Sequence, residues 1–164
     1  MSDQSLETES GAVDLPTEQD TVDFGTKLAG QVRPGDVIAL QGPLGAGKTT
    51  LARGFIHALT GAEEEVVSPT FTLVQTYDTP VGTVWHFDLY RLNDPEEVWE
   101  LGLEEAMAGG ITLIEWPERM GAHVLRGCLH VELSNDPKES RRTARISSPP
   151  EWQGRIKTVV DRAD

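Results

Sequence analysis

The sequence predicts an α/β fold, in which a mixed, mostly parallel central sheet is flanked by helices and extended by antiparallel hairpins. Two short apolar runs, at residues 37–41 and 111–114, are typical of buried strands. Helical patterns lie before and after the first run, as expected where strands and helices alternate along a chain. The length of 164 residues is typical of one domain, which we expect at residues 15–164.

The N-terminal part of the chain predicts a tail followed by a helix. Residues 1–14 are acidic and polar with little to bury, so we expect them to be disordered. A first helix is predicted over residues 17–32, because Thr17 can cap it and Asp20 stands three residues later, as in a capping box. The Arg-Pro-Gly-Asp sequence at 33–36 then turns the chain into the first strand.

A glycine-rich loop follows the first strand directly. Residues 42–49 (GPLGAGKT) fit the phosphate-binding pattern GxxxxGK[ST], and apolar residues recur with helical spacing over 50–59. Glycines let backbone N–H groups point at phosphates, and the positive end of the following helix adds to the attraction. Lys48 would add a full charge, and Thr49 a hydroxyl ligand for Mg²⁺. The sequence therefore predicts a P-loop nucleoside triphosphate site at Gly42, Leu44, Gly45, Ala46, Gly47, Lys48, Thr49 and Thr50.

The middle of the chain predicts a hairpin and then a helical segment. Residues 71–77 and 83–88 have the composition of strands, and the turn residues at 78–82 lie between them. The helical segment begins at 94–97, where Pro can occupy the first helical position and acids the first turn. Two glycines at 109–110 end it.

The last part of the chain predicts a buried strand and a second hairpin. The buried strand covers residues 111–114. Apolar and polar residues alternate over 129–133, turn residues follow at 135–138, and Ala144 and Ile146 continue the pattern. We therefore expect an antiparallel pair here.

Two carboxylates stand at the ends of apolar strands. Glu115 directly follows the buried strand, so it is expected at the carboxyl edge of the sheet, where open α/β sheets bind ligands. We expect Glu115 and Thr49 to be the metal ligands. Asp88 then remains to orient or deprotonate an attacking water, while Lys48 stabilises the charge of the transition state. Asp88 and Lys48 are therefore the expected catalytic residues.

The sequence does not decide the roles of two residues near Asp88. His86 and Tyr90 would share a face with Asp88 if the strand continued. A site role for them is about as well supported as packing or local hydrogen bonding.

Composition limits the classes of partner and compartment. The formal net charge of −13 opposes direct binding of nucleic acid phosphates and favours a basic protein surface as partner. No apolar run approaches the roughly 18 residues needed to cross a bilayer, and the N-terminus does not resemble a signal segment, so we expect a cytoplasmic protein with no membrane contact. Cys128 is the only cysteine, which excludes an internal disulfide and a cysteine-based zinc site.

Three stretches together resemble the TsaE family. They are the loop at 42–50 (GPLGAGKTT), the pair SPTFTLVQTY at 68–77 and HFDLYRL at 86–92, and IEWPER at 114–119. The likeness covers about residues 17–134, in the order and at the separations of the family. The combination of these motifs with a P-loop is highly specific.

The resemblance implies an ATPase of tRNA threonylcarbamoyladenosine synthesis, with ATP and Mg²⁺ as cofactors. In that family the ATPase docks on the heterodimer of TsaD and TsaB, and its ATP hydrolysis supports repeated turnover of the transferase. That enzyme modifies the adenosine at position 37 of tRNAs reading ANN codons, so the ATPase meets tRNA only through its partners. The resemblance also implies a switch-like loop at 68–70 and places Arg91 and Trp116 near the nucleotide and the partner.

Three other functional classes are weighed against this one. A GTPase is the weakest rival, because the chain has no NKxD stretch to read guanine. A small-molecule kinase is the main alternative, since Arg91, Arg119 and Arg126 could be taken for lid or acceptor residues. We expect the three late arginines on a solvated hairpin face: Arg141, Arg142 and Arg145. A non-catalytic, nucleotide-dependent interaction module is the third possibility.

Overall fold

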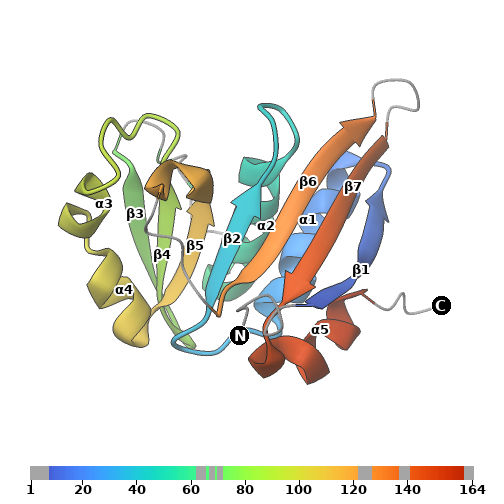
Figure 1. The fold of residues 1–164 in the computed structure, drawn as a ribbon. Helices are drawn as coiled ribbons and strands as arrows, with labels where there is room; N and C mark the ends of the chain where they lie inside the picture. The colour runs from blue at the N-terminus through green and yellow to red at the C-terminus, as the bar shows by residue number, and fades with distance from the viewer. Residues whose placement is uncertain are drawn as a thin grey trace, which may run out of the picture.

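The computed structural model describes residues 8–61, 66, 69, 72–121, 127–136 and 141–160. In this part of the chain, seven strands form one sheet with the order β1-β7-β6-β2-β5-β4-β3 (Figure 1). The strands are β1 Thr8–Leu15, β2 Val37–Gln41, β3 Val74–Thr79, β4 Gly82–Asp88, β5 Ile111–Glu115, β6 Leu129–Asp136 and β7 Arg141–Ser148. The α-helices are α1 Glu18–Ala29, α2 Lys48–Thr60, α3 Glu97–Glu100, α4 Leu103–Gly109 and α5 Gln153–Val160. Two short 3-10 helices are η2 Pro117–Met120 and η3 Pro150–Trp152.

The centre of the sheet is parallel and both of its sides are antiparallel. β2 pairs in parallel with β5 and β6, and β5 pairs in parallel with β4. The strand pairs β6–β7, β7–β1 and β3–β4 are antiparallel. This is the predicted α/β fold with hairpin additions, so the prediction of the fold class is confirmed.

Helices cover both faces of the sheet. On one face, α1 and α2 enclose the larger core, in which Phe24, Leu51 and Phe55 pack against strand residues such as Ile38 (Figure 1). On the other face, a second cluster joins Phe87 of β4 to residues of β5, α3, α4 and η2. All five residues of β5 are buried, as expected for a parallel strand covered on both faces. None of the described helices is long and apolar enough to cross a membrane.

The first helix begins where the sequence predicts. The Thr17 hydroxyl accepts a hydrogen bond from the backbone N–H of Asp20 (3.1 Å), and the Asp20 carboxylate accepts one from the backbone N–H of Thr17 (2.9 Å). The predicted capping box is therefore confirmed. The helix ends at Ala29, three residues before the predicted end.

The prediction that the chain is disordered up to residue 14 is wrong for residues 8–14. These residues belong to β1, which pairs with β7 from Thr8 opposite Ser148 to Leu15 opposite Arg142, with a register shift between Glu9 and Gly11. The pairing with β7 provides hydrogen-bond partners for the backbone N–H and C=O groups of β1. A pattern of side-chain hydrophobicity does not reveal such backbone pairing. Because β1 belongs to the same sheet as the rest, the expected domain boundary at residue 15 is also wrong.

Both predicted hairpins are confirmed, with shifted ends. The turn between β3 and β4 is shorter than the predicted one at 78–82, because the strands continue until Thr79 lies opposite Gly82. The Thr79 hydroxyl accepts a hydrogen bond from the backbone N–H of Val81 (3.1 Å) and stabilises the turn. In the second hairpin, β6 pairs with β7 from His130 opposite Ser147 to Asp136 opposite Arg141. The strand thus includes the first half of the predicted turn, and residues 137–138 lie outside the described residues.

The helical segment predicted between residues 94 and 110 is divided in two. Gly102 has a left-handed backbone (φ 93°) and separates α3 from α4. A Cβ atom at this position would lie 2.9 Å from the ring of Trp85, so Gly102 also lets the chain pass close to that side chain. The helix propensity of the segment does not reveal this close contact.

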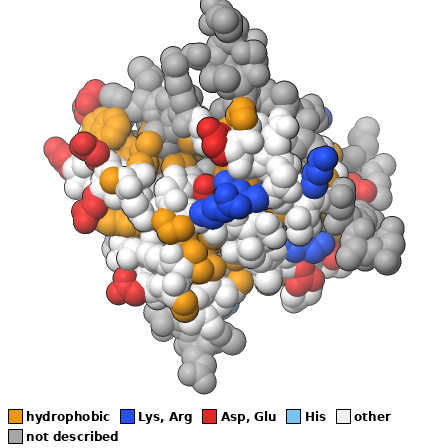
Figure 2. Space-filling view, turned by 90° about the horizontal axis from the view of Figure 1, so that it is seen from below, with side chains coloured by type: hydrophobic (Ala, Val, Ile, Leu, Met, Phe, Trp, Pro, Cys, Tyr) orange, Lys and Arg blue, Asp and Glu red, His pale blue; other side chains and the backbone are white. Residues whose placement is uncertain are grey.

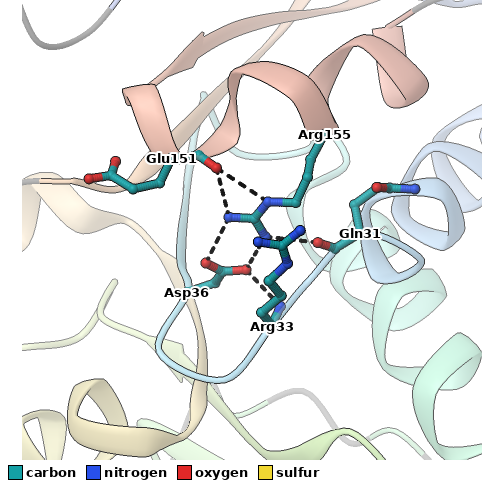
Figure 3. Close-up of polar contacts among 5 residues, drawn as sticks. All are labelled: Gln31, Arg33, Asp36, Glu151 and Arg155. Atoms are coloured by element: carbon teal, nitrogen blue, oxygen red, sulfur yellow. Dashed lines mark hydrogen bonds and ion pairs between the residues drawn. The ribbon is translucent and has the colours of Figure 1, made fainter.

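An ion pair ties the last helix to the turn before β2. In Figure 3 the guanidinium of Arg155 lies against the carboxylate of Asp36, with Nη1–Oδ2 and Nη2–Oδ1 distances of 2.6 and 3.2 Å. The same carboxylate accepts a hydrogen bond from the backbone N–H of Arg33 (2.7 Å). The two paired side chains are only 10% and 13% exposed, so water screens the interaction little.

The remaining donors of Arg155 are used as well. Nη1 donates to the carbonyl of Gln31 (2.8 Å), and Nη2 donates to the carbonyl of Glu151 (3.2 Å). The guanidinium also lies 4.0 Å from the ring centre of the buried Trp152. Figure 2 views the molecule from below and shows a group of Lys and Arg side chains near the middle of that face, with Asp or Glu side chains close to it. Arg155 thus joins α5 to the chain that leads into the central strand.

We predict that Arg155→Ala lowers the free energy of unfolding by roughly 2–3 kcal/mol, between the values for exposed and fully buried ion pairs. The loss would come from the uncompensated Asp36 carboxylate and the two freed carbonyls. Urea denaturation measures it, with Lys157→Ala on the exposed side of the same helix as control. Equal stability of the two variants would contradict a stabilising role of the ion pair.

Candidate nucleotide-binding site

A cavity of about 500 Å³ lies at the carboxyl ends of the central strands. The loop between β2 and α2 forms its floor, and Asp88 and Glu115, at the ends of β4 and β5, line it as well. Of the residues predicted to bind nucleotide, six line the cavity: Leu44, Gly45, Gly47, Lys48, Thr49 and Thr50. The structure therefore brings the predicted loop and both predicted carboxylates together.

Gly42 and Ala46 belong to the loop but do not line the cavity. Ala46 is fully buried, and the backbone of Gly42 has φ 146°. A Cβ atom on Gly42 would lie only 2.4 Å from the carbonyl oxygen of Leu133 in β6. Gly42 is thus needed for the close approach of the loop to β6.

The start of α2 leaves backbone donors available. Its N-cap, Gly47, has a left-handed backbone (φ 106°) and offers no side chain to accept a hydrogen bond from the first turn. The first N–H groups of a helix lack partners within the helix and carry the positive end of its dipole. An anion in the cavity could accept hydrogen bonds from these groups.

Lys48 lies across the loop. Its ammonium donates to the carbonyl of Gly42 and to that of Pro43 (2.9 Å). Burial lowers the pKa of Lys48, and the nearby carboxylates, Glu115 first among them, oppose this shift. The side chain is only 5% exposed, so its charge acts in an environment where electrostatic attraction to a phosphate is strong.

Glu115 is held from two sides. Its Oε1 accepts a hydrogen bond from the hydroxyl of Thr49 (2.9 Å), and its Oε2 lies 2.7 Å from Nε2 of His86. Asp88 lies opposite Glu115 in the pairing of β4 with β5, so the two carboxylates share one edge of the sheet. An Asp88 oxygen accepts a hydrogen bond from the backbone N–H of Tyr90 (3.1 Å) as the chain turns away from the strand.

The oxygen atoms of Thr49 and Glu115 fit the ligand preferences of Mg²⁺. This ion takes oxygen ligands and is commonly held by one or two side chains together with substrate phosphates and water. Among the described residues, no group of three or more His, Cys, Asp and Glu side chains could hold a metal ion. A metal here would therefore depend on Thr49, Glu115 and the phosphates of a ligand.

Aromatic and basic side chains cover one side of the cavity. The ammonium of Lys48 lies 4.0 Å from the ring centre of Trp116, which packs on Tyr90 at 4.8 Å between ring centres. The guanidinium of Arg119 lies 5.4 Å from the ring of Tyr90. Trp116 has φ 62°, an uncommon conformation for a bulky residue. Trp116, Tyr90 and Arg91 also line the cavity.

The sequence reading missed two residues of the cavity. Arg142 was expected on a solvated face, but it is half-buried and lines the cavity, with Nη1 3.8 Å from where a Cβ of Gly47 would lie. Glu18, in the first turn of α1, lines it too. β6 runs parallel to β2 and β7 runs antiparallel to β6, so β7 starts at the edge of the sheet where β2 ends. Predicting these two pairings would have placed Arg142 at the cavity. Arg145 is exposed, as expected.

Ser68 and Thr70 of the switch-like loop lie outside the described residues, as does Arg126.

Comparison with known proteins identifies the family. A family model described as "Threonylcarbamoyl adenosine biosynthesis protein TsaE" matches residues 15–144. The chain belongs to the TsaE family. A TsaE protein of Rickettsia bellii is 48% identical over 104 residues, which are 63% of this chain and 72% of that protein. One from Synechocystis is 44% identical over 113 residues, which are 65% of this chain and 69% of that protein.

The fold also has a counterpart among solved structures. The crystal structure of YdiB from Bacillus subtilis superposes with a TM-score of 0.72 and covers 93% of both chains at 22% identity. At this identity the likeness shows the fold alone. It extends beyond the 15–144 range of the TsaE family model, which leaves out α5 and nearly all of β1.

We predict that Gly42→Ala destabilises the protein more than Gly45→Ala does. Alanine at Gly42 combines a strained backbone with a clash against β6, which we expect to cost about 2 kcal/mol or more. Gly45 also has positive φ (80°), but no described atom lies within 4 Å of its Cβ position, so we expect a loss of about 1 kcal/mol. Urea denaturation of the two variants compares them, and equal losses would contradict the close approach of loop and β6.

Proposed function

We propose that this protein is a Mg²⁺-dependent ATPase that supports the TsaD–TsaB transferase in forming threonylcarbamoyladenosine at position 37 of tRNAs reading ANN codons. The observation that carries the proposal is the convergence of Lys48, Thr49, Glu115 and Asp88 on one cavity at the phosphate loop. Membership of the TsaE family, and the names of its relatives as tRNA threonylcarbamoyladenosine biosynthesis proteins, support the pathway.

The loop residues bind the triphosphate in this proposal. Lys48 and the other residues at the start of α2 line the same cavity, so their backbone N–H groups and the Lys48 ammonium can neutralise phosphate oxygens. To do so, Lys48 exchanges its hydrogen bonds to loop carbonyls for hydrogen bonds to phosphate. Thr49 and Glu115 hold Mg²⁺, which supplies positive charge to the phosphates.

Asp88 acts on the attacking water. Its carboxylate is nearly buried at the end of β4, beside the cavity, and its backbone turn is stabilised by the Tyr90 N–H. A carboxylate at this place can accept a proton from water or fix its orientation toward the outer phosphate. Lys48 then stabilises negative charge on the transferred group as the bond to the leaving oxygen breaks.

The partners in this proposal are proteins. The net charge of −13 opposes contact with tRNA phosphates, so the chain reaches tRNA through the TsaD–TsaB heterodimer. Trp116, Tyr90 and Arg91 line the cavity, where the nucleotide and a docked partner could both touch them. We therefore expect hydrolysis to be slow in the isolated protein and faster in the complex.

We predict that Asp88→Asn lowers the rate of phosphate release by about 10²-fold or more, the range for a positioned base, with ATP affinity nearly unchanged. Asparagine keeps an oxygen that can accept the Tyr90 N–H, so the local turn is retained. Single-turnover hydrolysis and calorimetric ATP binding measure the two effects. Asp78→Asn, an exposed position on β3, is the control. A collapse of ATP binding would instead assign Asp88 to the structure or to the metal.

We predict that phosphate release from ATP rises when purified TsaD and TsaB are added, and that depletion of the protein lowers threonylcarbamoyladenosine in cellular tRNA. Phosphate release without any acceptor supports an ATPase, whereas transfer of the phosphate to a metabolite would support the alternative, a small-molecule kinase. Nucleoside mass spectrometry measures the modified base. Tight tRNA binding by the isolated chain, or unchanged modification after depletion, would contradict the proposal.

A further inference from the structure

His86 is a fully buried polar residue that the proposed mechanism does not yet use. It lies in β4, two residues before Asp88, and is 0% exposed. Burying an imidazole away from water is unfavourable unless its polar atoms are satisfied. Among the described residues, its side chain makes one hydrogen bond, the 2.7 Å contact between Nε2 and Oε2 of Glu115.

The strands place the two side chains on one face of the sheet. Side chains alternate between faces along a strand, and His86 and Val84 share the face of the larger core, beneath α2. Glu115 shares that face with Leu113 of the same core. His86, Glu115 and Thr49 therefore form a continuous chain of hydrogen bonds from β4 through β5 to α2.

The direction of the hydrogen bond follows from the acceptor. An ionised carboxylate can only accept, so Nε2 of His86 donates to Glu115. In the neutral ring Nδ1 then carries a lone pair and no hydrogen. Nδ1 has no hydrogen-bond partner among the described residues. Leaving an acceptor atom without a partner in the core costs less free energy than leaving an N–H donor without one, so this tautomer fits the site.

We propose that His86 is a positioning residue for the metal ligand Glu115. By holding Oε2, the ring fixes the rotation of the carboxylate and leaves Oε1 directed at the hydroxyl of Thr49. These two side chains would hold Mg²⁺. The inference rests on the proposed function, since it assigns a role within the same metal site. Groups that orient metal ligands typically change metal affinity about 10–100-fold when they are removed.

Two conservative substitutions separate this role from simple packing. The amide nitrogen of Gln lies as many bonds from Cβ as Nε2 of His does, so His86→Gln can still donate to Glu115. The amide nitrogen of Asn lies one bond nearer to the backbone, at the place of Nδ1, so His86→Asn cannot reach. Both variants put a neutral amide into the buried position, and Asn is the smaller of the two. Thermal unfolding checks that each variant is folded.

Calorimetric titration of ATP, in EDTA and over a series of Mg²⁺ concentrations, tests the proposal. In His86→Asn we expect the Mg²⁺ concentration for half-maximal tight binding to rise about 10–100-fold, with ATP affinity in EDTA within about twofold of wild type. His86→Gln should restore most of the Mg²⁺ response. His57→Asn, on α2 but outside the cavity lining, is the control and should match wild type.

Three results would overturn the inference. His86→Asn could respond to Mg²⁺ as wild type does, it could lose ATP affinity equally with and without Mg²⁺, or His86→Gln could fail to restore the response in a folded protein. Failure of the proposed function looks different, because the wild-type protein would then bind ATP without any effect of Mg²⁺ or would not bind it.

Discussion

Parallel pairing of β2, β5 and β4 is the constraint on which the rest of the site depends. In this pairing Leu40 lies opposite Glu115, and Glu115 lies opposite Asp88. Because the three strands run in the same direction, the phosphate loop and both carboxylates leave the sheet at one edge. A shift of β5 by one residue would turn Glu115 to the opposite face, away from Thr49. The buried strand that precedes Glu115 therefore determines its register as well as its burial.

Three polar side chains of the site, Lys48, Thr49 and Glu115, already have partners within the chain. Lys48 donates to loop carbonyls, and Thr49 donates to Glu115. When a ligand binds, these side chains therefore exchange hydrogen bonds within the chain for hydrogen bonds to the ligand. This arrangement avoids the free-energy cost of buried, unpaired polar groups.

Local patterns were enough to predict the parts of the structure that local interactions determine. The capping box of Thr17, the glycine-rich loop and the acids after apolar strands each follow from residues near one another in the sequence. Arg142 could not be placed in this way, because its position depends on the pairing of β7 with β6 and of β6 with β2. The division of a helix at Gly102 depends on Trp85, which is distant in sequence. In both cases a contact between distant residues decides the outcome.

The pairing of β1 has a consequence for the behaviour of the protein in concentrated solution. Without β1, one side of β7 would present a row of free N–H and C=O groups, to which a strand of another molecule could add. β1 covers this row and is itself the last strand on that side of the sheet among the described residues. The register shift between Glu9 and Gly11 interrupts the regular spacing of β1, and such bulges make a strand a poor template for further pairing. β1 thus disfavours edge-to-edge pairing of the sheets of two molecules.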